Sequence, residues 1–155
     1  MKTADELARV SEGMGAAGRR LVFTNGCFDL LHVGHVRYLE QARALGDALL
    51  VAVNGDASVR GLKGPGRPLN DEADRAEVIA ALGCVDYVTI FQERRVTNLL
   101  REIRPQVYAK GGDYTVETLD KDEGAALREI GAEIKILSLV PGKSTTKLIE
   151  RMGAS

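Results

Sequence analysis

The stretch Arg20–His35 reads RLVFTNGCFDLLHVGH and joins an apolar run, a glycine turn and the start of a helix. Its residues from Arg20 to Thr24 predict a buried first strand. A helix is expected over Val33–Leu45, where apolar residues recur at helical spacing and Gly46 follows as a stop signal. A strand that turns through glycine into a helix is typical of the first unit of a parallel α/β sheet.

Apolar runs and helical patterns alternate along the rest of the chain. Further strands are expected over Leu49–Val53, Val85–Phe91, Val107–Lys110 and Ile134–Val140. Helices are expected over residues 3–15, Asp56–Leu62, 71–82, 96–103, within 115–131, and over Ser144–Met152. Thr3 is the expected N-cap of the first, with Glu6 completing a capping box, and Asn70 is the expected N-cap of the helix over 71–82. We therefore predict an α/β fold of a single domain, a Rossmann-like doubly wound sheet of about five parallel strands.

Bulk properties narrow the class of protein. The chain has 155 residues, a formal net charge of -1 and two cysteines. This charge argues against nucleic acid or a membrane as partner, because domains that bind either are usually basic. Cys27 and Cys84 fit neither a metal-site nor a disulfide spacing, and no apolar run has the length of a signal core or a membrane span. We therefore expect a cytoplasmic protein with reduced thiols.

Glycines, cations and polar side chains follow the ends of the predicted strands, which is where doubly wound sheets bind ligands. They lie within Thr24–His35 after the first strand, Asn54–Arg67 after the second, Lys110–Asp113 after the fourth and Ser144–Thr146 after the fifth. Arg75 shares an apolar helix face with Ile79 and Leu82, which is unusual for an arginine unless its head reaches a partner. Cations gathered at one edge of a sheet predict a site for polyanions.

The only two histidines, His32 and His35, lie at the start of the first predicted helix after a strand. Together with the positive N-terminal end of that helix, two imidazoles can form a cradle for phosphate oxygens. Two other readings remain open. His32 can simply cap the helix while His35 packs in the core, or the pair can bind zinc, although no third ligand is evident.

The other candidate residues also have simpler explanations. Ser144 can be an ordinary helix N-cap, and Lys63 and Arg67 can be solvated loop charges. Asp29 can hold its loop through hydrogen bonds to the backbone, and Asp113 can be a turn residue. Their shared position at the strand ends favours the phosphate site.

The sequence resembles the cytidylyltransferase-like nucleotidyltransferases, whose signature is His-x-Gly-His. Within this family it is most similar to the D-glycero-β-D-manno-heptose 1-phosphate adenylyltransferase branch, over roughly residues 20–151. The stretches that carry the resemblance are TNGCFD at 24–29, VNGD at 53–56, LKGPGRP at 62–68, KGGDY at 110–114 and STT at 144–146. Lys143 departs from the uncharged residue that relatives carry before the last of these.

The resemblance implies transfer of AMP from ATP, with Mg²⁺, to the heptose 1-phosphate, which gives ADP-heptose and pyrophosphate for lipopolysaccharide synthesis. Residues 19–155 would then be the nucleotidyltransferase domain, preceded by a helix within residues 1–18. The residues implied as catalytic are His32, His35, Lys63 and Thr145. Those implied as nucleotide-binding are Thr24, Asn25, Gly26, Cys27, Phe28, His32, His35, Asn54, Arg75, Lys110, Gly111, Asp113, Ser144, Thr145 and Thr146. Those implied for the sugar phosphate are Asp29, Lys63 and Arg67, and no residue is assigned as a metal ligand.

Three rival functions stay open at this point. One is transfer of CMP to a phosphorylated alcohol such as glycerol 3-phosphate, the second is a nucleotide sensor without catalysis, and the third is a zinc-binding structural module. The expected partners are ATP and a sugar 1-phosphate, in a homo-oligomer. Many relatives carry this domain behind a sugar kinase, and here we expect the kinase step to belong to a separate protein.

Overall fold

Strand β1 (Leu21–Gly26) lies at the centre of a five-stranded sheet. In this computed structural model, which describes residues 1–112 and 119–137, the strand order is β3-β2-β1-β4-β5 and every pairing is parallel. The other strands are β2 (Ala48–Asn54), β3 (Tyr87–Phe91), β4 (Val107–Gly111) and β5 (Glu133–Leu137). The described helices are α1 (Ala4–Ala16), α2 (Val33–Arg43), α3 (Asp56–Lys63), α4 (Glu72–Ala80), α5 (Thr97–Ile103) and α6 (Lys121–Ile130).

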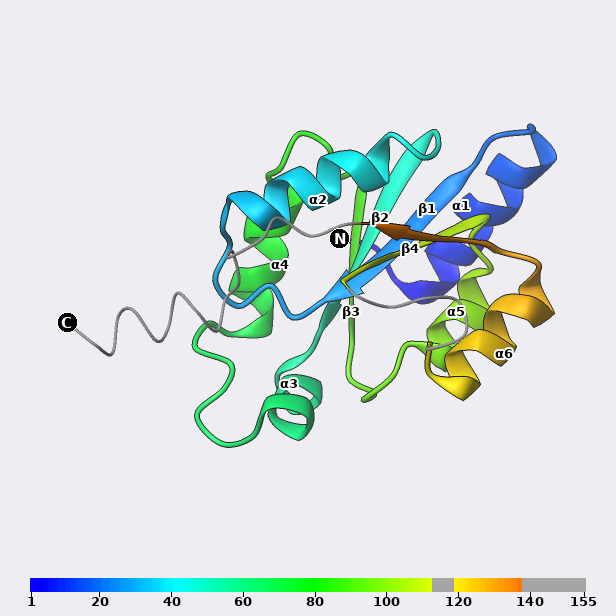
Figure 1. Cartoon of the computed structure of the whole chain (residues 1–155). Helices are drawn as coiled ribbons and strands as arrows, with labels where there is room; N and C mark the ends of the chain where they lie inside the picture. The colour runs from blue at the N-terminus through cyan, green and yellow to red at the C-terminus, as the bar shows by residue number, and fades with distance from the viewer. Residues whose placement is uncertain (113–118, 138–155) are drawn as a thin grey trace.

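Helices cover both faces of the sheet (Figure 1). On one face, side chains of α1, α5 and α6 pack against Leu21 and Phe23 of β1. On the other face, α2 and α4 pack against Val22 and the neighbouring strands. All residues of β2 are buried, as expected for a strand covered from both sides. The predicted doubly wound α/β fold is therefore confirmed.

The predicted elements correspond to the observed ones with small shifts at their ends. Thr3 caps α1 in a capping box with Glu6, as expected. The N-cap of α4 is Asp71 and not Asn70, because the Asp71 carboxylate accepts the backbone N–H of Asp74. Residues 138–140 of the fifth predicted strand and the predicted helix Ser144–Met152 lie outside the described residues.

The chain order creates a switch point between β1 and β4. From β1 the chain proceeds outward to β2 and β3, whereas β4 and β5 lie on the opposite side of β1. The connections after β1 and β4 therefore leave the sheet in opposite directions and open a crevice beyond their carboxyl ends. In doubly wound sheets this crevice is the usual position of the ligand.

Two further expectations concern the thiols and the membrane. Cys27 and Cys84 are both free. Within the described part of the chain, no helix combines the length and the apolar character needed to cross a bilayer.

Gly46 lies where the turn after α2 passes close to the start of β1. A Cβ atom at Gly46 would come within 2.7 Å of the Arg20 carbonyl oxygen and 2.8 Å of a Val22 methyl carbon. We expect Gly46→Ala to lower the free energy of unfolding by about 1–3 kcal/mol, because the backbone must move to admit the methyl group. Urea unfolding followed by circular dichroism measures this change.

Gly83 provides the matched control. It also precedes a strand, but a Cβ atom there would meet no atom within 4 Å. Gly83→Ala should therefore change the free energy of unfolding by no more than about 0.5 kcal/mol. Equal destabilisation by both substitutions would contradict the close approach at Gly46.

Candidate active site

A cavity of about 390 Å³ lies at the switch point between β1 and β4. Residues from the end of β1 and the turn after it form one wall, the end of β4 forms another, and side chains of α2 and α3 complete it. The lining residues are Asn25, Gly26, Cys27, Phe28, His35, Tyr38, Lys63, Ala109, Lys110 and Gly111. Most of these were predicted from the sequence, and the structure brings them to one place.

The two histidines begin helix α2 and cap it. The Nδ1 atom of His32 accepts the Gly34 backbone N–H at 3.1 Å, and the Nδ1 atom of His35 accepts the His32 backbone N–H at 3.3 Å. This reciprocal arrangement is a capping box made by imidazoles. The capping explanation and the phosphate-site explanation are therefore compatible, because capping occupies only one nitrogen of each ring.

Capping also fixes the protonation pattern of the rings. In a neutral imidazole whose Nδ1 accepts a hydrogen bond, the ring proton lies on Nε2. The rings of His32 and His35 stack with centroids 3.9 Å apart. Burial, aided by the adjacent His32 and Lys63, lowers the pKa of His35 from its ordinary 6.5 to about 4. At neutral pH His35 is thus an uncharged N–H donor.

Two lysines supply the positive charge of the cavity. Lys63 is the last residue of α3, and Lys110 lies near the end of β4. The Lys110 ammonium is 3.5 Å from a carboxylate oxygen of Glu123. Burial lowers the pKa of Lys110. These two cations approach the cavity from different elements, which suits a ligand with several negative charges.

Two buried contacts beneath the cavity were not predicted. Tyr108 donates its hydroxyl proton to Glu123 and lies 3.3 Å from the Asn25 side-chain oxygen. On the other face of the sheet, the hydroxyl groups of Thr24 and Tyr38 are 2.7 Å apart. Tyr38 follows His35 by three residues and could have been found from that helical spacing, whereas nothing in the sequence marks Glu123.

Several predicted residues lie beside the cavity rather than in its lining. Thr24 and Asn54 are buried, and the Asn54 amide donates to Ser58. Asp29 accepts the backbone N–H groups of Leu69 and Asn70 and pairs with Arg67, so it does hold its loop. These contacts hold the loops around the cavity in place.

Arg75 is fully enclosed, with only 2% of its surface exposed. Its guanidinium donates to the carbonyl oxygens of Cys27, Asn54 and Asn70, and it pairs with Asp56. The guanidinium of Arg75 therefore finds its expected partners within the protein itself. Its predicted contact with nucleotide stays a prediction.

Four predicted residues lie outside the described part of the chain: Asp113, Ser144, Thr145 and Thr146. Within the described ranges, no group of three or more His, Cys, Asp or Glu side chains is placed to hold a metal ion.

A doubly wound sheet with a cationic cavity at its switch point is the arrangement found in many α/β domains that bind nucleotides. The sequence model of the cytidylyltransferase-like family matches residues 23–151. The chain belongs to this family. The predicted resemblance and the predicted class, nucleotidyltransferase, are thereby confirmed.

Similar proteins agree with this assignment. The bifunctional protein HldE of Geotalea uraniireducens is 51% identical over 152 residues, which cover 98% of this chain and 31% of that protein. HldE of Pelobacter propionicus is 51% identical over 156 residues, with the same shares covered. The chain thus spans about a third of the length of these relatives.

A solved structure matches most of the fold. The crystal structure of the lipopolysaccharide core biosynthesis protein from Thermoplasma volcanium GSS1 superposes with a TM-score of 0.65 at 30% sequence identity. The match covers 79% of this chain and 98% of that one.

The lowered pKa of His35 predicts a pH dependence of stability. Between pH 6.5 and about 4 the unfolded chain takes up a proton at this imidazole while the folded chain does not. The free energy of unfolding should therefore fall as the pH drops through this interval, and His35→Gln should reduce the slope. Urea unfolding at several pH values measures the slope for each protein. The carboxylates are common to both proteins, so their contribution cancels when the two slopes are subtracted. Equal slopes would show that His35 is not held neutral.

Proposed function

We propose that the chain transfers AMP from ATP to D-glycero-β-D-manno-heptose 1-phosphate, giving ADP-heptose and pyrophosphate for lipopolysaccharide synthesis. The observation that carries the proposal is the cavity at the switch point, where the neutral His35 meets Lys63 and Lys110. The motifs that resemble the heptose 1-phosphate branch support it. The relatives named bifunctional protein HldE and the lipopolysaccharide core biosynthesis protein are in keeping with it.

The reaction is an in-line displacement at phosphorus. An oxygen of the sugar 1-phosphate attacks the α-phosphorus of ATP, a new P–O bond forms, and the bond to the β-phosphate oxygen breaks to release pyrophosphate. Because the attacking oxygen is already an anion, the reaction needs no general base. The protein contributes by orienting two polyanions and by stabilising charge on the pentacoordinate α-phosphate.

The described residues suit that task. The neutral His35 can donate from Nε2 without adding charge, while Lys63 and Lys110 offset the phosphates. Burial raises the pKa of the Cys27 thiol, which keeps it protonated and a poor nucleophile. We assign His32, His35 and Lys63 to stabilisation of the transferring phosphate. We assign the turn from Asn25 to Phe28 to contact with the nucleotide.

The sugar phosphate is assigned to the neighbourhood of Lys63 and Arg67. The Nε atom of Arg67 is 3.0 Å from Asp29, whereas within residues 1–112 and 119–137 no acceptor reaches its buried Nη2 atom. A buried guanidinium N–H of this kind suits a phosphate oxygen. Thr145 and its neighbours Ser144 and Thr146 are proposed to contact the pyrophosphate end, as the resemblance implies.

Magnesium is proposed to enter as part of the substrate. Mg²⁺ prefers oxygen ligands, and the described cavity lining contains no carboxylate. The ion would therefore be carried by the phosphate oxygens of ATP. Activity in the cytoplasm and assembly into a homo-oligomer stay predictions, and analytical ultracentrifugation measures the second.

Pyrophosphate release tests the proposed reaction directly. ATP and CTP are each offered with heptose 1-phosphate and with glycerol 3-phosphate, and we expect release with ATP and the heptose compound. Release only with CTP and glycerol 3-phosphate would show that the protein is a cytidylyltransferase and not an adenylyltransferase. Nucleotide binding without release in any combination would favour the sensor.

His35→Ala is expected to lower turnover by about 100-fold or more, since loss of one transition-state donor typically costs about 3 kcal/mol. Thermal unfolding of the same variant checks that it still folds. Glu40→Ala, on the exposed side of the same helix, is the control and should keep normal turnover. A folded and fully active His35→Ala protein would remove the basis of the assignment.

A further inference from the structure

Phe28 adopts an unusual backbone conformation in the turn that lines the cavity. Its φ angle is +49°, in the left-handed region that L-residues with a side chain rarely occupy. A bulky residue persists there only when the surrounding contacts hold it in place. The two residues next to Phe28 provide such contacts.

On one side, Arg75 holds the residue before Phe28. Its Nη1 atom donates to the Cys27 carbonyl oxygen at 2.8 Å and to the Asn54 carbonyl oxygen at 2.6 Å. Its Nη2 atom pairs with Asp56 at 2.8 Å. Since Asn54 ends β2 and Asp56 begins α3, Arg75 ties the Cys27 carbonyl to a rigid part of the fold.

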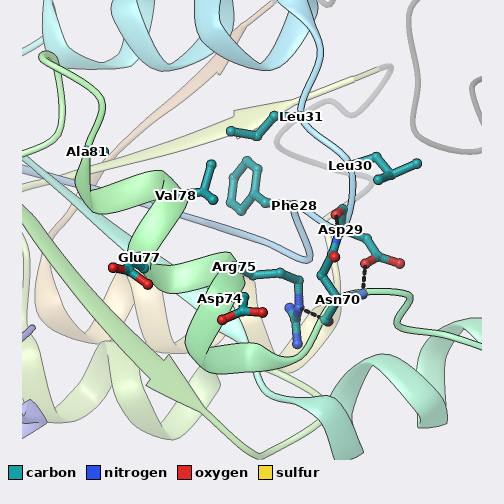
Figure 2. A pocket seen from close by; sticks show the side chains of 10 residues that line it. All are labelled: Phe28, Asp29, Leu30, Leu31, Asn70, Asp74, Arg75, Glu77, Val78 and Ala81. Atoms are coloured by element: carbon teal, nitrogen blue, oxygen red, sulfur yellow. Dashed lines mark hydrogen bonds between the residues drawn. The ribbon is translucent and has the colours of Figure 1, made fainter.

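On the other side, Asp29, the residue after Phe28, is itself held by the segment before α4. Its carboxylate accepts the backbone N–H groups of Leu69 and Asn70 at 2.8 and 2.9 Å, and its carbonyl oxygen accepts the Asn70 side-chain amide at 2.7 Å. Asn70 also accepts from the Nε atom of Arg75 at 2.9 Å. Figure 2 shows Asp29, Asn70 and Arg75 meeting beside Phe28. We call Arg75 and Asp29 the Phe28 clamp.

The clamped conformation directs the Phe28 ring into the site. Phe28 is 7% exposed, and a Cβ atom at Gly26 would lie 2.8 Å from its ring. It meets the His35 ring edge to face, with centroids 5.4 Å apart. Phe28 also lines a second cavity of about 500 Å³, in which Leu31 and Val78 lie beside the ring (Figure 2). Phe28 therefore borders both cavities and contacts His35.

We propose that Arg75 and Asp29 are positioning residues: they hold Phe28 in the left-handed conformation, and through its ring they fix and shield the imidazole of His35. Arg75 then acts on the reaction without touching nucleotide, which differs from its predicted direct contact. The expected effect of these residues on turnover rests on the proposed function. Their expected effect on His35 does not, because it exists without substrate.

NMR titration of the histidines in the nucleotide-free protein is the first test. Arg75→Lys keeps the charge but cannot reach all its acceptors at once. With the clamp loosened, water should reach His35, and its pKa should rise by about one unit or more from the present value of about 4. The other charged or titratable groups around His35 are unchanged in this variant: His32, Tyr38, Lys63, Lys110 and the Cys27 thiol.

Phe28→Leu is the second test, and it remains informative if Arg75→Lys folds poorly. It removes the aromatic contact while leaving the clamp residues in place, so it should also raise the pKa of His35. When Arg75→Lys and Phe28→Leu are combined, their effects on the pKa of His35 should not add, because both act through the same ring. Turnover should fall by about tenfold or more in each, with a smaller change in KM for ATP.

Ile79→Val is the matched control for lost stability. Ile79 is fully buried on the same helix α4, one turn after Arg75, and is absent from the lining of both cavities. It should leave the titration of His35 and the turnover unchanged. An unchanged His35 titration in folded Arg75→Lys and Phe28→Leu would overturn the inference. Failure of the unmodified protein to release pyrophosphate would instead overturn the proposed function.

Discussion

The parallel pairing of β1 with β2 on one side and β4 on the other is the constraint on which the site depends. It places the ends of β1 and β4 next to each other, so the turn after β1 faces Lys110 and Gly111 across the crevice. Backbone hydrogen bonds of a buried sheet set this geometry before any ligand is present. The loops then need only to hold their side chains in the opening.

The start of helix α2 shows how one pair of residues can serve both the fold and the chemistry. His32 and His35 satisfy backbone N–H groups at the helix end through their Nδ1 atoms. The same bonds direct the ring protons to Nε2, so helix capping also selects the tautomer. A serine or aspartate would cap the helix as well, but it would not present a neutral ring N–H in this position.

Local patterns in the sequence predicted the order of strands and helices, because buried parallel strands are continuous apolar runs and the helices carry clear start and stop signals. The gathering of Asn25, His35, Lys63 and Lys110 followed from their positions after strand ends. The contacts of Arg75 could not be derived, since three of its acceptors are main-chain carbonyls from the turn after β1, the end of β2 and the segment before α4. The Tyr108–Glu123 contact joins β4 to α6 and leaves no local pattern. The cap of α4 was assigned one residue too early because both Asn70 and Asp71 are good N-caps.

The buried guanidinium of Arg75 also limits how this fold can vary. Its acceptors come from the turn after β1, the end of β2 and the segment before α4, so these parts cannot change length independently. An insertion between Asn70 and Arg75 would move the Asn70 carbonyl oxygen away from a buried guanidinium donor. Insertions after Lys63 and before Arg67 would leave those bonds intact, because none of the acceptors of Arg75 lies in that loop. That short loop, beside the proposed phosphate site, is therefore free of the restriction that the arginine imposes on its neighbours.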